Sequence, residues 1–238
     1  MRSSSLDGTW FDDDPQRHGV SHIHVGCLLA LTFGTGIIDA LSWISLNGVF
    51  TSNMSGNVLL LSMGAVGAGG TDWGPALFSL GWFLLGAAVA GRIGRGEPPK
   101  WTSRTTAIVA GVTVLLALVA AATAVWPPHR LDASAFTVTA VLSFAMGAQG
   151  AAAVQVAVSQ IVTVAVSSTT VGLGMTLFLG VGLRDLGVLR RLLAIVLMGL
   201  GAAVGGVLAS DAFAWGILVA AVVAASAAAV GHLSRDRQ

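Results

Sequence analysis

Long apolar stretches joined by short polar connections make up most of this chain. Six of them hold 18 to 25 residues each: Val25–Leu46, Gly74–Gly91, Thr105–Trp126, Ala133–Ala157, Leu192–Ala209 and Ala212–Gly231. An α-helix rises about 1.5 Å per residue, so each stretch can cross an apolar bilayer core about 30 Å thick. The pattern predicts an all-α membrane protein with six transmembrane helices.

Two further apolar segments, Val49–Gly69 and Ser159–Gly182, are broken by Gly, Ser, Thr or Asn residues. Irregular backbone at membrane depth is stable only where protein or trapped water satisfies its N–H and C=O groups. We therefore predict that both are re-entrant segments, which enter and leave on the same side. The alternative for the first is a plain extracellular loop between two ordinary helices.

Composition agrees with a membrane protein. Hydrophobic residues make up 55% of the chain, charged residues 10%, and the mean hydropathy is +0.83; a soluble domain carries about 25% charged residues. Residues 1–19 are polar, lack the features of a cleavable signal peptide and are expected to form a disordered cytosolic tail. The net charge of +1, without a basic stripe, argues against a nucleic-acid partner.

The distribution of Lys and Arg selects the topology. With six spans and two re-entrant segments, eleven of the 12 Lys and Arg residues fall on one side and only Arg130 on the other. If both broken segments crossed, the split would be eight to four. Because cytosolic loops are enriched in Lys and Arg, we expect six spans with both termini cytosolic. Trp73, Trp101 and Trp126 then fall at span ends, where tryptophan is common.

Three sequence similarities indicate an internal duplication. Residues 31–36 (LTFGTG) resemble 142–147 (LSFAMG), 52–56 (SNMSG) resemble 168–172 (STTVG), and 86–91 (GAAVAG) resemble 201–206 (GAAVGG). The offsets of 111, 116 and 115 residues are nearly constant. Because each half holds three spans, the second half is predicted to be inverted relative to the first. The two repeats are expected to cover 20–127 and 128–234.

Asp39 is the only charged residue within the six predicted spans. A carboxylate at bilayer depth costs at least about 2.5–3.5 kcal/mol, so such residues usually bind solutes or relay protons. Asn47 lies eight residues later, on the same helix face by period, and Gln149 lies one position from the repeat partner of Asp39. The alternative is a structural acid that hydrogen-bonds the re-entrant backbone and never titrates.

The broken segments supply the other candidate binding residues. In the first, Gly56 would allow a tight turn and Asn53 or Ser55 would cap a short helix that begins near Asn57. The N–H groups at the start of that helix would favour an anion or a carbonyl-bearing solute. In the second segment, the corresponding candidates are Thr169, Thr170 and Gly172.

Catalysis, metals and cofactors are not expected. Ser55-Gly56 resembles the Ser-Gly of an intramembrane serine protease, but no histidine lies within a predicted span to act as its base. No His-Glu-x-x-His motif or pair of intramembrane aspartates occurs, and the single Cys27 excludes a disulfide within the chain. Ala87-x-x-x-Gly91 and Gly201-x-x-x-Gly205 are small-residue motifs expected to pack helices within the fold, with a homo-oligomer interface as the alternative.

Four segments carry a family resemblance: Gly36-x-x-Asp39-Ala40, Gly48-Val-Phe50, Asn53-Met-Ser-Gly-Asn57 and Phe144-Ala-Met-Gly-Ala-Gln149. With them, residues 20 to 232 resemble the bacterial YoaK family (UPF0700), domain of unknown function 1275. Ser55 stands where the family commonly has Thr, and Gly150 where it often has Asn. The resemblance implies a multi-pass protein of the bacterial inner membrane and supplies no substrate.

The sequence therefore predicts a secondary transporter for a small organic or anionic solute, with proton coupling through Asp39. Its other partner would be the lipid bilayer. The alternative is a non-transport membrane scaffold or partner-binding subunit whose broken segments are structural.

Overall fold

A computed structural model describes residues 21–70, 72–156, 170–175 and 186–235. Six helices in these residues are long and apolar enough to cross a membrane, which confirms the predicted number of spans. They are α1 (His22–Ser45), α3 (Gly74–Ile93), α4 (Ser103–Val125), α5 (Ala133–Gln155), α7 (Leu186–Leu208) and α8 (Phe213–Leu233). The shorter elements are α2 (Met54–Ala65), a 3₁₀ turn (Ala68–Gly70) and a helical turn at residues 170–175.

The helix that deviates most from its predicted bounds is α7, which begins six residues before Leu192. Its first turns carry Arg190 and Arg191, which hydropathy excludes from a span. Both side chains have partners at this end of the bundle: Arg190 donates to Nδ1 of His22 at 3.1 Å, and Arg191 donates to the Gly172 carbonyl at 2.9 Å. The helix continues because these contacts accommodate its charges.

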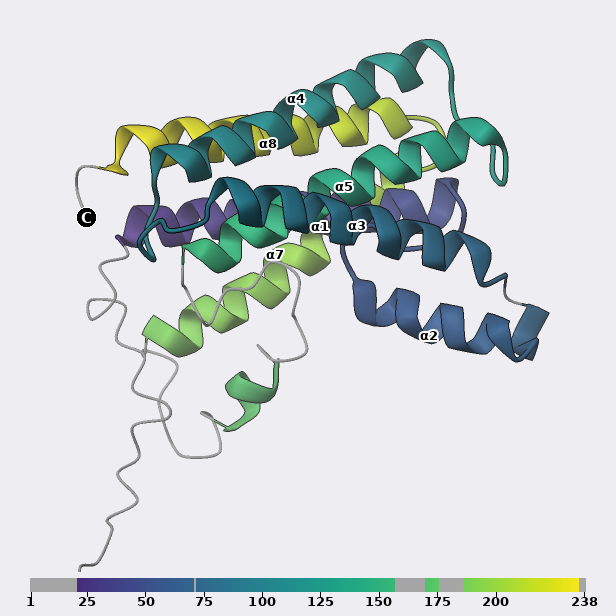
Figure 1. Cartoon of the computed structure of the whole chain (residues 1–238), viewed down its shortest axis with the longest axis horizontal. Helices are drawn as coiled ribbons and strands as arrows, with labels where there is room; N and C mark the ends of the chain where they lie inside the picture. The colour runs from purple at the N-terminus through teal and green to yellow at the C-terminus, as the bar shows by residue number, and fades with distance from the viewer. Residues whose placement is uncertain (1–20, 71, 157–169, 176–185, 236–238) are drawn as a thin grey trace, which may run out of the picture.

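Hydrogen bonds between distant segments define the two ends of the bundle. At one end, beside the Arg190–His22 contact, Arg235 donates to Ser103 at 2.9 Å. At the other, Ser45 donates to the Ala209 carbonyl at 2.7 Å. Helices α1, α4 and α7 therefore run in one direction and α3, α5 and α8 in the other (Figure 1). The first end, here called the basic end, carries the described basic residues Arg92, Arg95, Lys100, Arg104, Arg190, Arg191 and Arg235; Arg130 lies at the opposite end.

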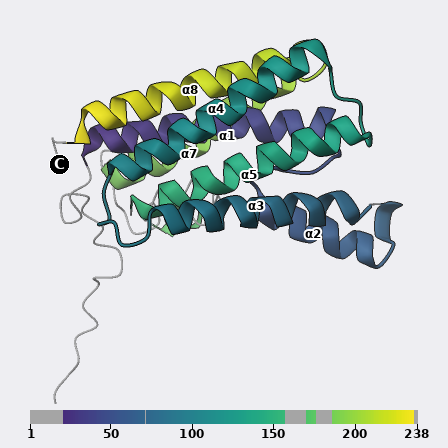
Figure 2. The ribbon, with the colours of Figure 1, turned by 45° about the horizontal axis from the view of Figure 1, so that its top comes forward.

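The helices pack in a reciprocal pattern. Helix α1 packs against α7 and α8, α5 packs against α3 and α4, and α4 lies along α8 (Figure 2). If α1, α3 and α4 are matched with α5, α7 and α8, these contacts map onto one another, and α1 and α5 run in opposite directions. This is the packing that interlocked inverted repeats would have. The duplication and its boundaries at 20–127 and 128–234 stay predictions.

Glycines form the two closest helix crossings. At the α1–α7 crossing, a Cβ on Gly36 would overlap the Met198 carbonyl, and one on Gly201 would overlap the Phe33 carbonyl. At the α3–α5 crossing, Gly86 meets the Phe144 carbonyl in the same way, and its counterpart there is Gly147, which meets the Phe83 carbonyl. Small residues allow such backbone contact between membrane helices.

The small-residue motifs are confirmed in part as packing elements. Gly201 and Gly205 both lie against the backbone of α1, as expected. In the first half the close approach is made by Gly86, whereas Gly91 has no atom within 4 Å of a Cβ position. The expectation for Gly91 is therefore wrong, because the side of α3 that faces α5 carries Gly86. A homo-oligomer through other Gly/Ala-rich faces stays a prediction.

The connection between α3 and α4 folds under the bundle. Trp101 is 2% exposed and stacks on His24, with ring centroids 5.4 Å apart. The His24 imidazole also contacts the Gly231 carbonyl through Nε2 at 3.2 Å. The interfacial position predicted for Trp101 is therefore wrong, since its indole fills the space that the absent side chain of Gly231 leaves. Trp73 and Trp126 are exposed at the opposite end.

The side of the membrane that the basic end faces can be tested by cysteine labelling. Single cysteines at Gly96 and Arg130, in a Cys27→Ala background, should differ in intact cells treated with an impermeant thiol reagent. We expect labelling at 130 and none at 96, because Lys- and Arg-rich loops stay cytosolic. Labelling of both after permeabilisation is the control, and labelling at 96 in intact cells would contradict this topology.

Candidate functional site

Asp39 binds the connection between α1 and α2. Its Oδ1 accepts hydrogen bonds from the backbone N–H of Thr51 at 3.0 Å and of Ser52 at 2.8 Å, and from the Thr51 hydroxyl at 3.3 Å. Its Oδ2 accepts from the Ser52 hydroxyl at 2.5 Å. All four donors are neutral, and the carboxylate is 5% exposed. The charge of Asp39 is thus held by a short piece of backbone.

The chain turns back toward the bundle before it reaches α2. Helix α1 ends at Ser45, and Gly48 then adopts a left-handed conformation with a φ of 66°. Asp39, the partner of Thr51 and Ser52, lies six residues before the end of α1, which corresponds to about 9 Å of helix. Helix α2 therefore begins well inside the end of α1 and runs outward again (Figure 1).

Gly48 takes the turning role that the sequence assigns to Gly56. Gly56 lies within the first turn of α2 and has no left-handed φ. A Cβ there would come within 2.8 Å of the Phe50 ring, so Gly56 allows a close approach. Asn53 caps α2 as predicted: its Oδ1 accepts from the Gly56 N–H at 3.3 Å and from the Ser55 hydroxyl at 2.8 Å.

Asn57 joins three elements of the bundle. It is the buried residue of α2, and its carboxamide pairs with the Phe50 backbone: Oδ1 accepts from the N–H at 2.9 Å and Nδ2 donates to the carbonyl at 2.6 Å. Nδ2 also donates to the Ser79 hydroxyl of α3 at 3.1 Å. Ser79 in turn shares a hydrogen bond of 2.9 Å with Ser143 of α5. A polar chain therefore runs from the connection into the bundle.

Asn47 and Gln149 have separate partners. Asn47 accepts from the Leu131 N–H at 3.1 Å and donates to Thr139 at 3.3 Å, which ties the end of α1 to the start of α5. Gln149 is 3% exposed and donates to the Thr35 hydroxyl of α1 at 3.0 Å. The Gln149 contact links α1 and α5 at a level different from that of Asp39.

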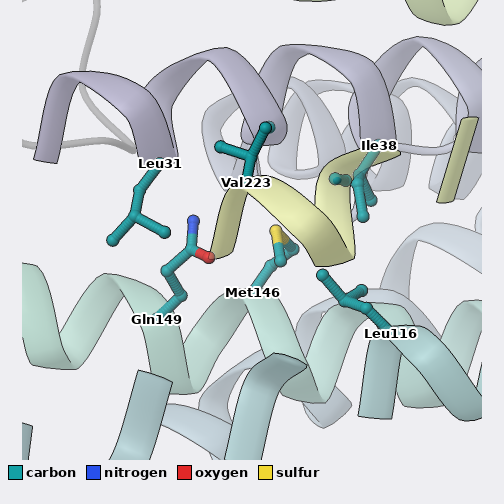
Figure 3. Close-up of a pocket in the computed structure, with 8 residues that line it drawn as sticks. Leu31, Ile38, Leu116, Met146, Gln149 and Val223 are labelled. Atoms are coloured by element: carbon teal, nitrogen blue, oxygen red, sulfur yellow. The ribbon is translucent and has the colours of Figure 1, made fainter. Parts of the chain in front are cut away.

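The gap beside Gln149 is closed. Figure 3 shows its carboxamide among apolar side chains from α1, α4, α5 and α8: Leu31, Ile38, Leu116, Met146 and Val223. This gap leaves no room for a water molecule. No hydrated path therefore leads to Gln149 in this conformation.

The candidates of the second broken segment lie elsewhere. Gly172 contacts Arg191 at the start of α7, and the helical turn at 170–175 is separate from α2 in Figure 1. The predicted meeting of Gly56 and Gly172 is not found. Thr170 belongs to the same turn, whereas Thr169 lies outside the described residues.

Sequence reasoning missed the partners of the candidates, above all Thr51, Ser52, Ser79 and Ser143. Thr51 and Ser52 precede the Asn-Met-Ser-Gly-Asn segment directly, so their place in the polar break was a usable signal. Ser79 and Ser143 carried none, because Ser and Thr hydroxyls inside helices commonly bond their own backbone carbonyls. Nothing local distinguishes a hydroxyl that bridges helices from one that does not.

Six apolar spans in an all-helical bundle, with a buried carboxylate and a helix that starts inside the bundle end, define a multi-pass integral membrane protein. The family model described as "protein of unknown function (DUF1275)" matches residues 27–230, so the chain belongs to this family. This confirms the family expected from the sequence.

The chain is also similar to the UPF0700 transmembrane protein YoaK of Bacillus subtilis, at 29% identity over 150 residues. The match covers 61% of this chain and 63% of YoaK, so the chain spans less than two thirds of the length of that relative. No solved structure matches the chain.

Proposed function

We propose that this protein is a secondary transporter for a small anionic solute and that Asp39 couples solute movement to a proton. The observation that carries the proposal is the set of four hydrogen bonds from Thr51 and Ser52 to the buried Asp39 carboxylate. A buried charge held by neutral donors on a loop can exchange its partners when it binds a proton, whereas a salt bridge would keep it charged.

Protonation of Asp39 would weaken its hold on the loop. Hydrogen bonds to a carboxylate are roughly twice as strong as those between neutral groups. With a proton on Oδ2, the N–H groups of Thr51 and Ser52 would become available to the carboxylate or phosphate oxygens of a solute. Proton and anion would then enter together, which reduces the charge that must move through the bundle.

The loose packing of α2 supports such a movement. Among the described helices α2 packs against α3, and Asn57 is its buried residue. Displacing α2 therefore exposes little apolar surface, and the Asn57–Ser79 bond would guide it. The closed gap at Gln149 fits an occluded state, in which the solute path opens only after the loop is released.

The test uses purified protein in vesicles that contain a pH-sensitive dye. Adding small carboxylates and phosphates outside should acidify the interior with the parent protein. Asp39→Asn keeps both backbone N–H bonds at its Oδ1, so it should fold and lose solute-driven acidification down to the level of empty vesicles. Asp211→Asn, an exposed acid at the start of α8, is the matched control and should acidify like the parent.

A different result would favour the scaffold alternative. If no solute moves protons with the parent protein and Asp39→Asn melts well below it, Asp39 is a structural residue that anchors the loop.

A further inference from the structure

A second concave site lies on the outside of the bundle, between α3 and α5. Its walls are Phe78 and Trp82 of α3 and Phe136, Ala140 and Phe144 of α5, and its floor is Leu115 of α4. We call it the aromatic groove. Its volume is about 480 Å³, which contrasts with the closed gap at Gln149.

The glycine crossing explains why the groove exists. Helices α3 and α5 touch backbone to backbone at Gly86 and Gly147. Phe78 lies eight residues from Gly86 along α3, in the half of the helix nearer the opposite end. There Phe78 meets Phe136 edge to face, with centroids 5.4 Å apart, and also meets Trp82 at 6.3 Å. Rings hold the helices apart where glycines no longer draw them together.

The chemistry of the groove excludes the solute proposed above. None of its lining residues is charged. Its polar lining residue is Thr137, whose hydroxyl already donates to the Ala133 carbonyl at 2.8 Å. An anion would find no donor there, so the groove is independent of the Asp39 site.

We propose that the aromatic groove binds one acyl chain of a membrane phospholipid. Both walls belong to membrane-spanning helices, so the groove is continuous with the surface that contacts the bilayer. Trp82 is 37% exposed on its rim, and Leu118 of α4 is 61% exposed beside it. Groups that line an unfilled gap lose their dispersion contacts on that side. A flexible hydrocarbon chain restores them, and the bilayer supplies it at high concentration.

Brominated lipids test the proposal, because bromine quenches tryptophan fluorescence on contact. The protein is placed in vesicles of dioleoylphosphatidylcholine, or of the same lipid brominated at the chain double bonds. The emission of Trp82 is the difference between the parent and Trp82→Phe. We expect its quenching by brominated lipid to be at least twofold larger in the parent than in Ala140→Phe, where the added ring fills the groove.

Ala117→Phe is the matched control, because Ala117 is exposed on α4 two residues from Leu115 and therefore faces away from the groove. It should be quenched like the parent. If Ala140→Phe does not fold, Ala140→Leu serves as a smaller plug with a smaller but measurable loss. Equal quenching in parent and plugged protein would overturn the proposal. So would a Trp82 that bromine does not reach in the parent, which would assign the groove to a second copy of the chain.

Discussion

Asp39→Leu is expected to lower the free energy of unfolding by about 2–6 kcal/mol. The substitution leaves the backbone N–H groups of Thr51 and Ser52 buried without an acceptor, and each such group costs about 1–3 kcal/mol. The loop would separate from α1, and α2 would lose its fixed starting point. Thermal unfolding in detergent, followed by circular dichroism or by the loss of a monodisperse elution peak, measures the effect.

Two variants separate the lost acceptor from other causes. Asp39→Asn keeps an oxygen at Oδ1 and should cost only about 1 kcal/mol, the net contribution of one hydrogen bond. Asp211→Leu changes an exposed acid and should have little effect. An Asp39→Leu protein that melts within a degree or two of the parent would show that the loop does not depend on the carboxylate.

Adding one methyl group at the glycine crossings should destabilise the bundle severely. In Gly86→Ala, Gly147→Ala and Gly201→Ala the new Cβ overlaps a backbone carbonyl of the facing helix, which cannot rotate away as a side chain could. Overpacking usually costs about 1–3 kcal/mol. We expect the upper end of that range or more, because the whole helix must move.

The same helices offer matched controls. Gly81 of α3 and Gly199 of α7 have no atom within 4 Å of a Cβ position. Gly81→Ala and Gly199→Ala should leave the melting temperature unchanged or raise it, since alanine is favoured over glycine in helices by about 1 kcal/mol. If the crossing variants behaved like these controls, α3–α5 and α1–α7 would not be packed as closely as described.

The positions of the spans were predictable because each membrane helix satisfies its own backbone hydrogen bonds. Hydropathy over about 20 residues was therefore enough for five of the six spans, and for most of α7. The start of α7 was missed, because only its contacts with His22 and Gly172 show how two arginines fit there. Asp39 stood out for a similar local reason, as a charge that an apolar span does not carry without a partner.

The identity of that partner depended on the tertiary structure. The pairing of Asp39 with Thr51 and Ser52 requires the chain to turn back at Gly48, and the many glycines of this sequence look alike until the backbone conformation is known. The Ser79–Ser143 bond and the contact of Gly86 with Phe144 depend on which helix faces meet. Small residues occur on every face of these helices, so local sequence cannot select among the pairings. Close packing between whole helices makes that selection.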